Sequence, residues 1–403
     1  MKEGPIELTR LAKKTGALYP LNFINAQTVK KVQGFHKSFP MYKVTPLASM
    51  HGLAKELGVC KIFVKDESYR FGLNAFKVLG GSYAIGNYMA HKLGVDISEL
   101  PYDKMVSDET RRRLGELTFV TATDGNHGRG VAWTANLLKQ KSVVYMPKGS
   151  STERLANIRA EGAEAYIKDM NYDDAVRLAD RTAKENGWII VQDTSWEGYT
   201  DIPTWIIQGY TTMGYEAYKQ LPEKPTHIFL QAGVGSMAGA ISGLFADIYG
   251  DDRPIIIIVE PHKANCLYRT AMADDGNLHI AVGDMNTIMA GLACGEPCSI
   301  AWKVLRDYAD FFISCPDYVA AKGMRMMGNP PAGDMRVISG ESGAATLGAA
   351  SEIIQNAAYA RLKETLMLDA NSRILLFSTE GDTDRESYKA IVWDGKFPSF
   401  YNI

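Results

Sequence analysis

The sequence predicts an α/β fold, with largely parallel, twisted sheets flanked by helices. Three observations support this prediction. Short apolar segments rich in β-branched residues recur along the chain, helical patterns separate several of them, and polar, glycine-containing loops accompany three of them. Because parallel strands are usually covered on both faces, they are apolar along their whole length. We therefore expect these segments to be buried parallel strands of a doubly wound fold.

The expected strands and helices can be placed along the chain. Eight segments are short, apolar and rich in β-branched or aromatic residues, as buried strands are. They lie at 61–65, 117–122, 142–147, 163–168, 188–193, 227–232, 254–260 and 373–378. Between them, 152–162 and 172–187 have apolar residues at helical spacing and a glycine at or near the end, which predicts two helices.

Length and charge limit the classes of protein to consider. A chain of 403 residues exceeds a domain of about 100–200 residues, so we expect two domains, or one large unit with an insertion. Lys plus Arg number 44 and Asp plus Glu 46, which leaves no field to attract nucleic acid or a membrane surface. The N-terminal ten residues lack the apolar core of a signal peptide, and the apolar run at 254–261 is too short to span a bilayer. We expect a soluble cytoplasmic protein.

The cysteines do not indicate a disulfide framework or a metal site. There are five, an odd number without regular spacing, so most are expected to be buried thiols. Cys294 and Cys298 form a C-x-x-x-C pair, but only His279 lies near them in the sequence, which is weak support for zinc. We expect no metal.

The loop after the strand at 227–232 has the pattern of an anion site. Its sequence GVGSMAG, at 233–239, leads into a helix of small residues, so backbone N–H groups and a helix N-terminus should converge there. Gly233 and Gly235 permit close backbone approach, and the Ser236 hydroxyl can add a donor. Neither a P-loop lysine nor a dinucleotide-binding pattern is present. The alternative is a strand-to-helix turn that binds nothing.

Two further loops carry candidate catalytic groups. The segment TDGNHGRG, at 123–130, presents Asp124, Asn126 and His127 after a strand, although an Asx turn that caps the next helix explains it as well. The segment AFKVLGG places Lys77 at the start of a helix behind an aromatic residue. Such a lysine is usually a solvated surface residue. Near a helix N-terminus in apolar surroundings, however, its neutral amine is favoured, as Schiff-base chemistry requires.

These loops occur together with other short motifs in one consistent order along the chain. The motifs are TPL at 45–47, AFK at 75–77, GNH at 125–127, the glycine-rich loop, VEP at 259–261, TIMAGLA at 287–293 and S-x-x-G-D-x-D at 378–384. By their order, over nearly the whole chain, the sequence resembles the tryptophan-synthase-β and threonine-dehydratase family of pyridoxal-phosphate enzymes, known as fold type II. Pyridoxal 5'-phosphate is therefore the expected cofactor.

The resemblance implies roles for individual residues. Lys77 would hold the cofactor as a Schiff base and Asn126 would bind its phenolic oxygen, while the phosphate would lie on Gly233, Val234, Gly235, Ser236 and Met237. Ser378, with Thr379 as the alternate, would face the pyridine nitrogen. A neutral hydroxyl there suits elimination better than reactions that need a long-lived quinonoid. Thr123, Asp124, Gly125 and His127 would contact the substrate.

The resemblance also indicates a substrate. The segment at 192–210 and Asp124 resemble members of the family that eliminate ammonia from 2,3-diaminopropionate. A carboxylate beside the carboxylate of an amino acid is repulsive unless the substrate carries a second ammonium group, which this substrate does. Asp124 would also serve as the base for the D isomer and Lys77 as the base for the L isomer. Asp193 is a second candidate for the same site, although a cap or turn explains it equally well.

The family also implies an architecture and a set of alternatives. A large cofactor domain is expected from 1–85 and 190–403, with a smaller α/β domain inserted at 86–189, the site between them and a homodimer as the assembly. A serine or threonine dehydratase would share Lys77, Asn126 and the phosphate loop, but Asp124 and the segment 192–210 argue against it. A non-catalytic amino-acid-binding protein would not need Lys77. A nucleotide-binding dehydrogenase is disfavoured because its fingerprint is missing.

Overall fold

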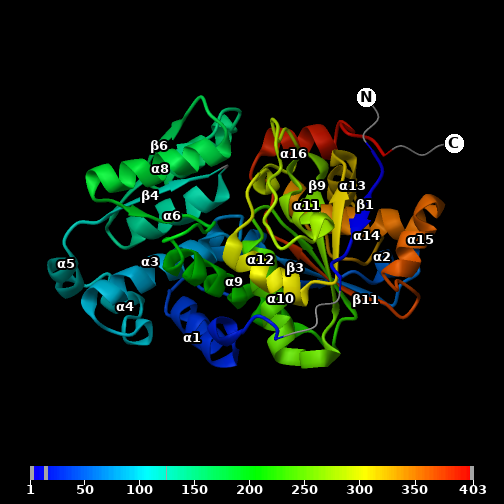
Figure 1. Ribbon diagram of the computed structural model, residues 1–403, viewed down its shortest axis with the longest axis horizontal. Helices are drawn as coiled ribbons and strands as arrows, with labels where there is room; N and C mark the ends of the chain where they lie inside the picture. Colours follow the sequence, from blue (N-terminus) through cyan, green and yellow to red (C-terminus); the bar gives the residue numbers. More distant parts are fainter. Residues whose placement is uncertain (1–3, 13–16, 124, 400–403) are drawn as a thin grey trace.

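The computed structural model describes residues 4–12, 17–123 and 125–399. In these ranges the strands form a larger and a smaller sheet, and helices pack against both (Figure 1). The described helices include none that is both long and apolar enough to cross a membrane. The α/β class with largely parallel sheets, predicted from the sequence, is confirmed.

The larger sheet has seven strands within the described residues, in the order β1-β10-β9-β8-β11-β3-β2. Their bounds are β1 Glu7–Thr9, β2 Leu47–Ser49, β3 Lys61–Asp66, β8 His227–Gln231, β9 Ile255–Pro261, β10 Phe311–Cys315 and β11 Arg373–Ser378. The inner strands pair in parallel, whereas the edge strands β1 and β2 pair antiparallel with β10 and β3. The carboxyl ends of β3, β8, β9 and β11 therefore lie along one edge, which is where ligands bind in such sheets.

The smaller sheet is parallel throughout, in the order β6-β5-β4-β7. Its strands are β4 Thr118–Ala122, β5 Lys141–Met146, β6 Glu164–Ile167 and β7 Ile189–Ile190. Figure 1 shows β4 and β6 at the upper left together with helices α6 and α8, apart from β1, α13 and α14 at the right. The two sheets thus form the centres of two distinct parts of the molecule.

Helices connect the strands of both sheets. They are α1 Ala26–Lys37, α2 His51–Leu57, α3 Val78–Leu93, α4 Tyr102–Met105, α5 Asp108–Leu114, α6 Asn126–Leu137, α7 Thr152–Ala160, α8 Tyr172–Asn186, α9 Asp201–Gln220, α10 Ser236–Tyr249, α11 Cys266–Ala273, α12 Ser299–Tyr308, α13 Asp317–Gly328, α14 Glu341–Gln355, α15 Ala360–Thr365 and α16 Arg385–Val392. Both helices predicted from the sequence are present as α7 and α8. At α8 the expected signals operate, because Asn171 accepts from Asp174 N at 2.8 Å and Gly187 ends the helix at φ +68°.

All eight predicted strands are present and pair in parallel, but one detail of the prediction is wrong. β6 is an edge strand with Glu164, Tyr166 and Ile167 exposed, so it is not buried. Three strands were not predicted. β1 and β2 have three residues each, too few to form a pattern, and the apolar run of β10 is short enough to fit a strand or a helix equally well.

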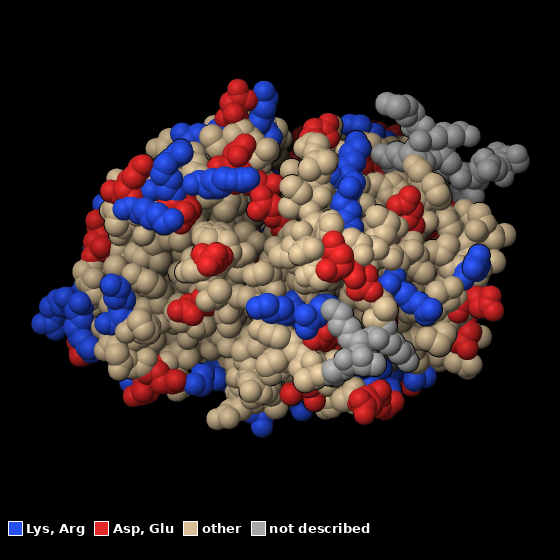
Figure 2. Space-filling model, in the orientation of Figure 1, with Lys and Arg blue, Asp and Glu red and all other residues tan. Residues whose placement is uncertain are grey.

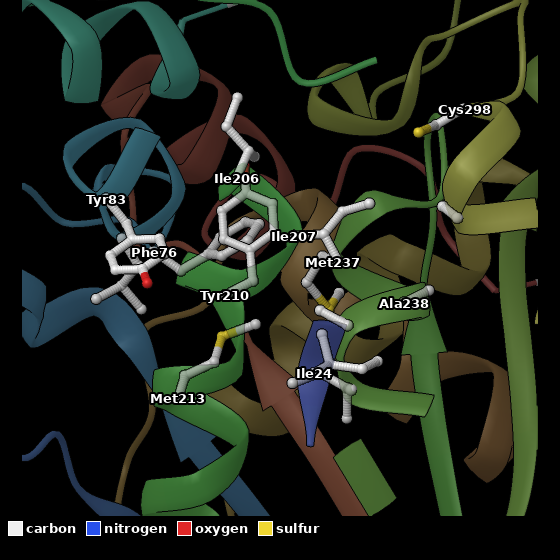
Figure 3. Close-up of a cluster of buried hydrophobic side chains, with 14 of the residues drawn as sticks. Ile24, Phe76, Tyr83, Ile206, Ile207, Tyr210, Met213, Met237, Ala238 and Cys298 are labelled. Atoms are coloured by element: carbon white, nitrogen blue, oxygen red, sulfur yellow. The ribbon is translucent and has the colours of Figure 1, made fainter. Parts of the chain in front are cut away.

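The core between the sheets and helices forms around α3 and α9. Glycines permit close contact there: a Cβ on Gly209 would lie 2.3 Å from Leu79 O, and one on Gly80 would lie 2.6 Å from Tyr210 Cε1. Figure 3 shows Phe76, just before α3, beside the ring of Tyr210 from α9. Their ring centroids are 4.7 Å apart. The start of α3 is thereby held rigidly against α9.

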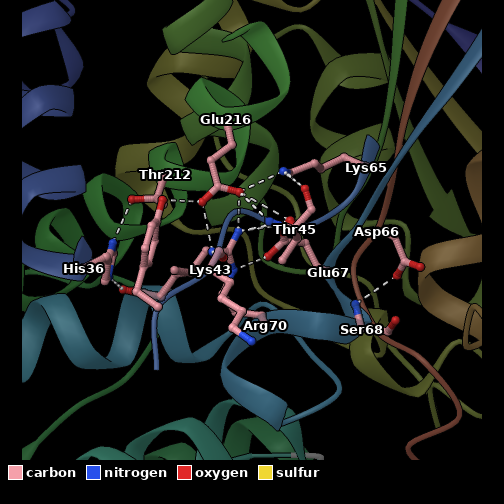
Figure 4. A network of polar contacts seen from close by, with 12 residues as sticks. His36, Lys43, Thr45, Lys65, Asp66, Glu67, Ser68, Arg70, Thr212 and Glu216 are labelled. Carbon is pink, nitrogen blue, oxygen red and sulfur yellow. Dashed lines mark hydrogen bonds and ion pairs between the residues drawn. The ribbon is translucent and has the colours of Figure 1, made fainter. Parts of the chain in front are cut away.

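A buried ionic network fastens the chain between β3 and α3 to α9 (Figure 4). Arg70 donates to both oxygens of Glu67 and both of Glu216, at 2.7–2.9 Å. Lys65 Nζ donates to Glu216 Oε2 at 2.8 Å and to Thr45 O at 2.7 Å. Two cations and two carboxylates balance one another, so burial of these charges is compensated by hydrogen bonds. The network fixes the backbone that leads to Lys77.

The surface carries charges of both signs. Figure 2 shows Lys and Arg side chains interspersed with Asp and Glu on the face in view, which agrees with the formal net charge of −2. Cys60 is exposed, whereas Cys266, Cys294, Cys298 and Cys315 are buried, as expected for most of the cysteines.

Candidate functional site

Lys77 lies at the N-cap of α3, at the edge where the strands of the larger sheet end. The preceding residues are pinned to the segment that follows β11: Phe76 N donates to Thr379 O at 3.0 Å, and Ala75 forms a β-bridge with Glu380. The Lys77 side chain is 17% exposed, so it is neither fully solvated nor fully buried. The surface-lysine alternative does not hold, and the amine faces a cavity.

Asp193 is the partner of this lysine. Lys77 Nζ donates to Asp193 Oδ2 at 2.7 Å, and the Asp193 side chain is 4% exposed. Burial alone raises the pKa of the Asp193 carboxyl, but the nearby charges of Lys77 and His127 outweigh it and hold this pKa below its usual range. Asp193 is therefore an ionised carboxylate beside the amine, and not simply a cap or a turn residue.

A chain of hydrogen bonds orients Asp193. Gln192 Oε1 accepts from Ala122 N at 3.0 Å, which fixes the amide so that Nε2 donates to the Tyr172 hydroxyl at 2.8 Å. Since the Tyr172 oxygen accepts there, its proton is available to Asp193 Oδ1, at 3.2 Å. The strand β7, the start of α8 and the lysine segment thus meet at one carboxylate.

The glycine-rich loop lies between β8 and α10 as predicted. Gly235 is the N-cap of α10 with φ +99°, a backbone conformation that favours glycine. A Cβ on Gly233 would lie 3.1 Å from Cys294 Sγ and 3.2 Å from Leu292 Cα, so this position is also tight. The Ser236 hydroxyl donates to Asp193 O at 2.6 Å, which links the loop to the Lys77 partner. The backbone N–H groups of the first turn of α10 remain as anion donors.

Thr123 follows the carboxyl end of β4, and α6 begins at Asn126. Thr123 Oγ1 accepts from Gly125 N at 2.9 Å and from Gly128 N at 3.1 Å, so it satisfies a backbone N–H in the first turn of α6. His127 is buried with Nε2 2.8 Å from Val191 O, which anchors the ring at the end of β7. Asn126 Nδ2 donates to Glu380 Oε2. Asp124, predicted as a catalytic residue, lies outside the described residues.

The segment after β11 contributes the opposite wall. Thr379 lines the cavity and accepts from Gln231 Nε2 at 2.8 Å through Oγ1. Ser378 is fully buried, and its Oγ donates to Glu380 O at 3.4 Å. Of the two hydroxyls considered from the sequence, the alternate, Thr379, which follows the last residue of β11, is the one in the cavity wall.

These elements line a cavity that opens to solvent. Its wall includes Lys77, Asn126, Asp193, the loop 232–238 and Glu380. A wider cleft continues from Lys77 and Asp193 and adds Thr123 and His127 to the wall. The residues predicted around Lys77, the phosphate loop and Asn126 are therefore brought together, although 116 residues separate Lys77 from Asp193.

Sequence reasoning missed several residues of the site. Gln192 and Tyr172 orient Asp193, Gln231 holds Thr379, and Glu380 contacts Asn126. A signal existed for Gln192 and Gln231, which are polar residues at the carboxyl ends of apolar strands. Tyr172 and Glu380 had none, because their roles depend on contacts between distant segments.

The cavity fits a phosphorylated aromatic aldehyde. A lysine amine lies on one side, a glycine-walled loop and the N-terminus of a helix of 14 residues on the other, and the Asn126 amide and Thr379 hydroxyl in the wall. A Cβ at Gly233 would crowd Cys294 and Leu292, so glycine lets the loop pack closely against that segment. Lys77 would bind the aldehyde and the loop the phosphate.

Comparisons with known proteins agree with this fit. The model of the family described as "Pyridoxal-phosphate dependent enzyme" matches residues 39–368. The chain is 53% identical over 389 residues to the diaminopropionate ammonia-lyase of Salmonella typhimurium (strain LT2), with 95% of this chain and 96% of that protein covered. It is 51% identical over 371 residues to the diaminopropionate ammonia-lyase of Escherichia coli (strain K12), with 91% and 92% covered.

Solved structures give the same result. The holo diaminopropionate ammonia lyase from Escherichia coli superposes with a TM-score of 0.91 at 47% identity, with 97% of both chains covered. The same enzyme with an aminoacrylate-PLP azomethine reaction intermediate superposes with a TM-score of 0.89 at 47% identity, with 97% of this chain and 98% of that chain covered. A threonine deaminase from Solanum lycopersicum, at 18% identity and a TM-score of 0.71 with 98% and 99% covered, shares the fold.

Proposed function

Because this chain belongs to the family of pyridoxal-phosphate-dependent enzymes, we propose that it is a carbon–nitrogen lyase that eliminates ammonia from both isomers of 2,3-diaminopropionate. One water is consumed, and pyruvate and two molecules of ammonia are formed. The observation that carries this proposal is the Lys77 amine 2.7 Å from an ionised, buried Asp193, in a cavity with a phosphate-type loop. High identity to two bacterial diaminopropionate ammonia-lyases supports the same substrate.

The residues that hold the cofactor follow from the cavity. Lys77 Nζ would bind its aldehyde carbon, and the loop from Gly233 to Met237 would bind its phosphate through backbone N–H groups. Asn126 would donate to its phenolic oxygen. Thr379 is the hydroxyl in the wall and would face the ring nitrogen, whereas Ser378 is fully buried. When bound, pyridoxal phosphate withdraws electrons from the substrate's Cα–H bond and so makes this proton acidic.

The ionised Asp193 is suited to the second ammonium group of the substrate. A buried carboxylate beside a cation is a strong, charge-assisted acceptor. Once Lys77 is engaged with the cofactor, Asp193 Oδ2 can accept from the β-ammonium of the substrate in its place. The hydrogen bond from Tyr172 to Oδ1 would keep the carboxylate in this orientation. Serine, which carries a neutral hydroxyl at Cβ, would gain less from this contact.

Proton transfer is assigned to Lys77 and Asp124. Lys77 would remove the Cα proton of the L isomer, and Asp124 that of the D isomer from the opposite face. Either group can then donate a proton to the departing β-amine. For Asp124, the proposal rests on its place before Gly125 and Asn126 in the sequence and on the family resemblance.

The central test combines a lysine variant with product counting. Lys77→Ala is expected to fold but to lose covalent cofactor attachment and nearly all turnover, whereas Lys141→Ala, at an exposed lysine, should retain both. The assays are visible absorbance, mass spectrometry after borohydride reduction, and pyruvate and ammonia released from a panel of amino acids. Two ammonia per pyruvate identifies diaminopropionate, whereas a ratio of one with serine as the best substrate would replace this function by that of a dehydratase.

A second test concerns the two isomers. Asp124→Asn is nearly isosteric but cannot accept a proton, so activity on the D isomer should fall by roughly 10²–10⁴-fold, as for loss of a general base. Activity on the L isomer should fall less. Paired kinetics on the two enantiomers measure the difference. Equal losses would make Asp124 a binding residue, and unchanged D activity would move the base to Asp193.

The domain division and the assembly are part of the same proposal. We place the smaller domain at 86–189, between the two parts of the larger domain at 1–85 and 190–403, so that closure of the cleft would exclude water from the reacting carbons. A cytoplasmic homodimer is proposed as well. Limited proteolysis checks the domain bounds, and light scattering of the purified protein checks the dimer.

A further inference from the structure

Glu380 is a buried carboxylate in the cavity wall for which the proposed function has no role. It is 2% exposed and accepts from Asn126 Nδ2. We propose that Glu380 is a positioning residue, which fixes the Asn126 amide in the orientation that presents a donor to the cofactor. This inference rests on the proposed function, because Asn126 is the residue assigned there to the phenolic oxygen.

Glu380 itself is held rigidly by backbone contacts. It forms a β-bridge with Ala75, two residues before Lys77, and its carbonyl accepts from Gly340 N at 2.9 Å. A Cβ on Gly340 would lie 2.9 Å from Glu380 Cγ, so a glycine there leaves room for the carboxylate. The backbone of Glu380 is therefore tied to the lysine segment and to the start of α14, and its side chain has little freedom.

The two oxygens of Glu380 have two different donors. Oε2 accepts from Asn126 Nδ2, and Oε1 accepts from Ser342 N at 3.3 Å in the first turn of α14. Both Glu380 oxygens are acceptors for N–H groups in the structure. Asn126 must therefore turn its NH₂ group, and not its carbonyl oxygen, toward Glu380. One N–H is then used by Glu380, and the second N–H of the same group remains for the cofactor.

This arrangement also joins the two sheets. Asn126 begins α6 after a strand of the smaller sheet, whereas Glu380 follows β11 of the larger sheet. The hydrogen bond spans 254 residues of sequence. The orientation of a cofactor-binding amide on one part of the molecule is thus set by a carboxylate on the other.

Glu380→Gln should reverse the Asn126 amide. Glutamine has one oxygen, and the backbone N–H of Ser342 cannot turn away, so the oxygen is expected to stay with Ser342. The NH₂ group then faces Asn126, which has to present its carbonyl oxygen instead. An acceptor would replace a donor at the phenolic oxygen, and loss of a hydrogen bond to a charged group typically weakens binding about tenfold or more.

The experiment is a double-variant cycle on cofactor affinity. Apo forms of wild type, Glu380→Gln, Asn126→Ala and the double variant are titrated with pyridoxal phosphate, and the visible absorption band of each holo form is recorded without substrate. Each single change should raise Kd about tenfold and shift the band. Because both changes act through one amide, the double variant should bind the cofactor no more weakly than the weaker-binding single variant.

A matched control is available on α14. Glu352 is also buried, at 3% exposure, and also accepts from an asparagine amide, with Asn356 Nδ2 at 2.8 Å, but it pairs with Lys322 and not with the cavity. Glu352→Gln alone should keep the cofactor Kd within about twofold of wild type, with the absorption band unchanged. Combined with Asn126→Ala, it should keep Kd within about twofold of Asn126→Ala alone. A purely structural effect of removing a buried carboxylate would appear in both glutamate variants.

The outcomes separate the inference from the function on which it rests. Additive effects, with Kd about 100-fold higher in the double variant, overturn the positioning role but leave Asn126 as a cofactor ligand. An unchanged Kd in Asn126→Ala overturns the ligand assignment and the positioning role together. An unchanged Kd in Glu380→Gln overturns the positioning role alone.

A second pair of variants tests the contact by stability, even where Glu380→Gln alone yields little folded protein. Asn126→Asp places two carboxylates in contact and should lower the melting temperature. Adding Glu380→Gln restores a donor–acceptor pair, so the melting temperature should recover while cofactor affinity stays low. No recovery of the melting temperature would overturn the contact itself.

Discussion

Substitutions at Gly235 separate backbone strain from repulsion of the cofactor phosphate. Gly235 has φ +99° at the N-cap of α10, where a residue with a side chain is strained by about 1–2 kcal/mol. A Cβ would lie 3.1 Å from Leu267 Cδ1 and 3.2 Å from Leu305 Cδ1, which are the mobile ends of side chains and can shift slightly. Gly235→Ala should therefore lower the free energy of unfolding of the apo protein by about 1–3 kcal/mol.

Gly235→Asp adds a charge to the same strain. Aspartate adopts a positive φ more readily than alanine, and its charge is favoured at a helix N-terminus, so the apo protein should be at least as stable as Gly235→Ala. Two unit charges about 4 Å apart at a dielectric constant of about 20 interact by about 4 kcal/mol. Even with screening, the phosphate should be repelled strongly enough to lower affinity about 10²–10³-fold below that of Gly235→Ala.

The assay is urea unfolding of each apo protein together with its pyridoxal phosphate Kd. The order should reverse between the two measurements: Gly235→Asp equals or exceeds Gly235→Ala in stability but binds cofactor far more weakly. Gly250→Asp is the control, because Gly250 ends the same helix at φ +53° with open space around it. If the two Gly235 variants bind the cofactor with Kd values within threefold of each other, the phosphate does not lie on this loop.

Four other predictions follow from single contacts. Asp193→Asn removes the charge proposed to bind the β-ammonium and should lower kcat/KM on diaminopropionate about 10–100-fold, as loss of a charge-assisted hydrogen bond does, and activity within threefold of wild type would contradict its role. Tyr172→Phe removes one donor to Asp193 and should raise KM more than it lowers kcat, which steady-state kinetics can separate. Glu216→Gln removes a negative charge that pairs with the buried Arg70 and should lower the free energy of unfolding by about 3–5 kcal/mol. A loss below about 1 kcal/mol in urea titration would argue against the network. Burial raises the pKa of Glu341 to about 7, against an ordinary value near 4.5, so its stability contribution is full in acid and lost as pH rises through 7. The melting temperature of Glu341→Gln minus that of wild type should therefore be larger at pH 8 than at pH 5. An equal difference at the two pH values would contradict this.

The elements and loops of this protein were largely predictable from local patterns. Strand propensity and helix signals placed eight strands and two helices, because apolar periodicity and capping depend on neighbours in sequence. Lys77 and the loop around Gly235 were found in the same way, since a strand that ends in glycines before a helix is itself the anion site. The fold type II cofactor site was implied by the family resemblance, which rests on the order of these motifs along the chain.

Contacts between distant segments were decided by the tertiary structure alone. The sequence presented Asp193 equally as a cap and as a catalytic residue, and only the 2.7 Å contact with Lys77 and the resulting low pKa separate the two. The choice of Thr379 over Ser378 for the cavity wall depends on the orientation of β11, which neighbouring strands set. Glu380 had no sequence signal at all.

One physical cause separates the features predicted from the sequence from those that only the structure decided. Hydrophobic period, turn chemistry and helix caps are interactions over a few residues, so the sequence by itself determined that this chain is an α/β protein with a lysine at a helix start and a glycine-rich phosphate-type loop. Which strands become neighbours, and therefore which side chains meet at the edge of the sheet, depends on burial of whole faces against one another. Only the folded structure decided that Asp193 reaches Lys77 and that Glu380 reaches Asn126, because each contact joins segments more than 100 residues apart.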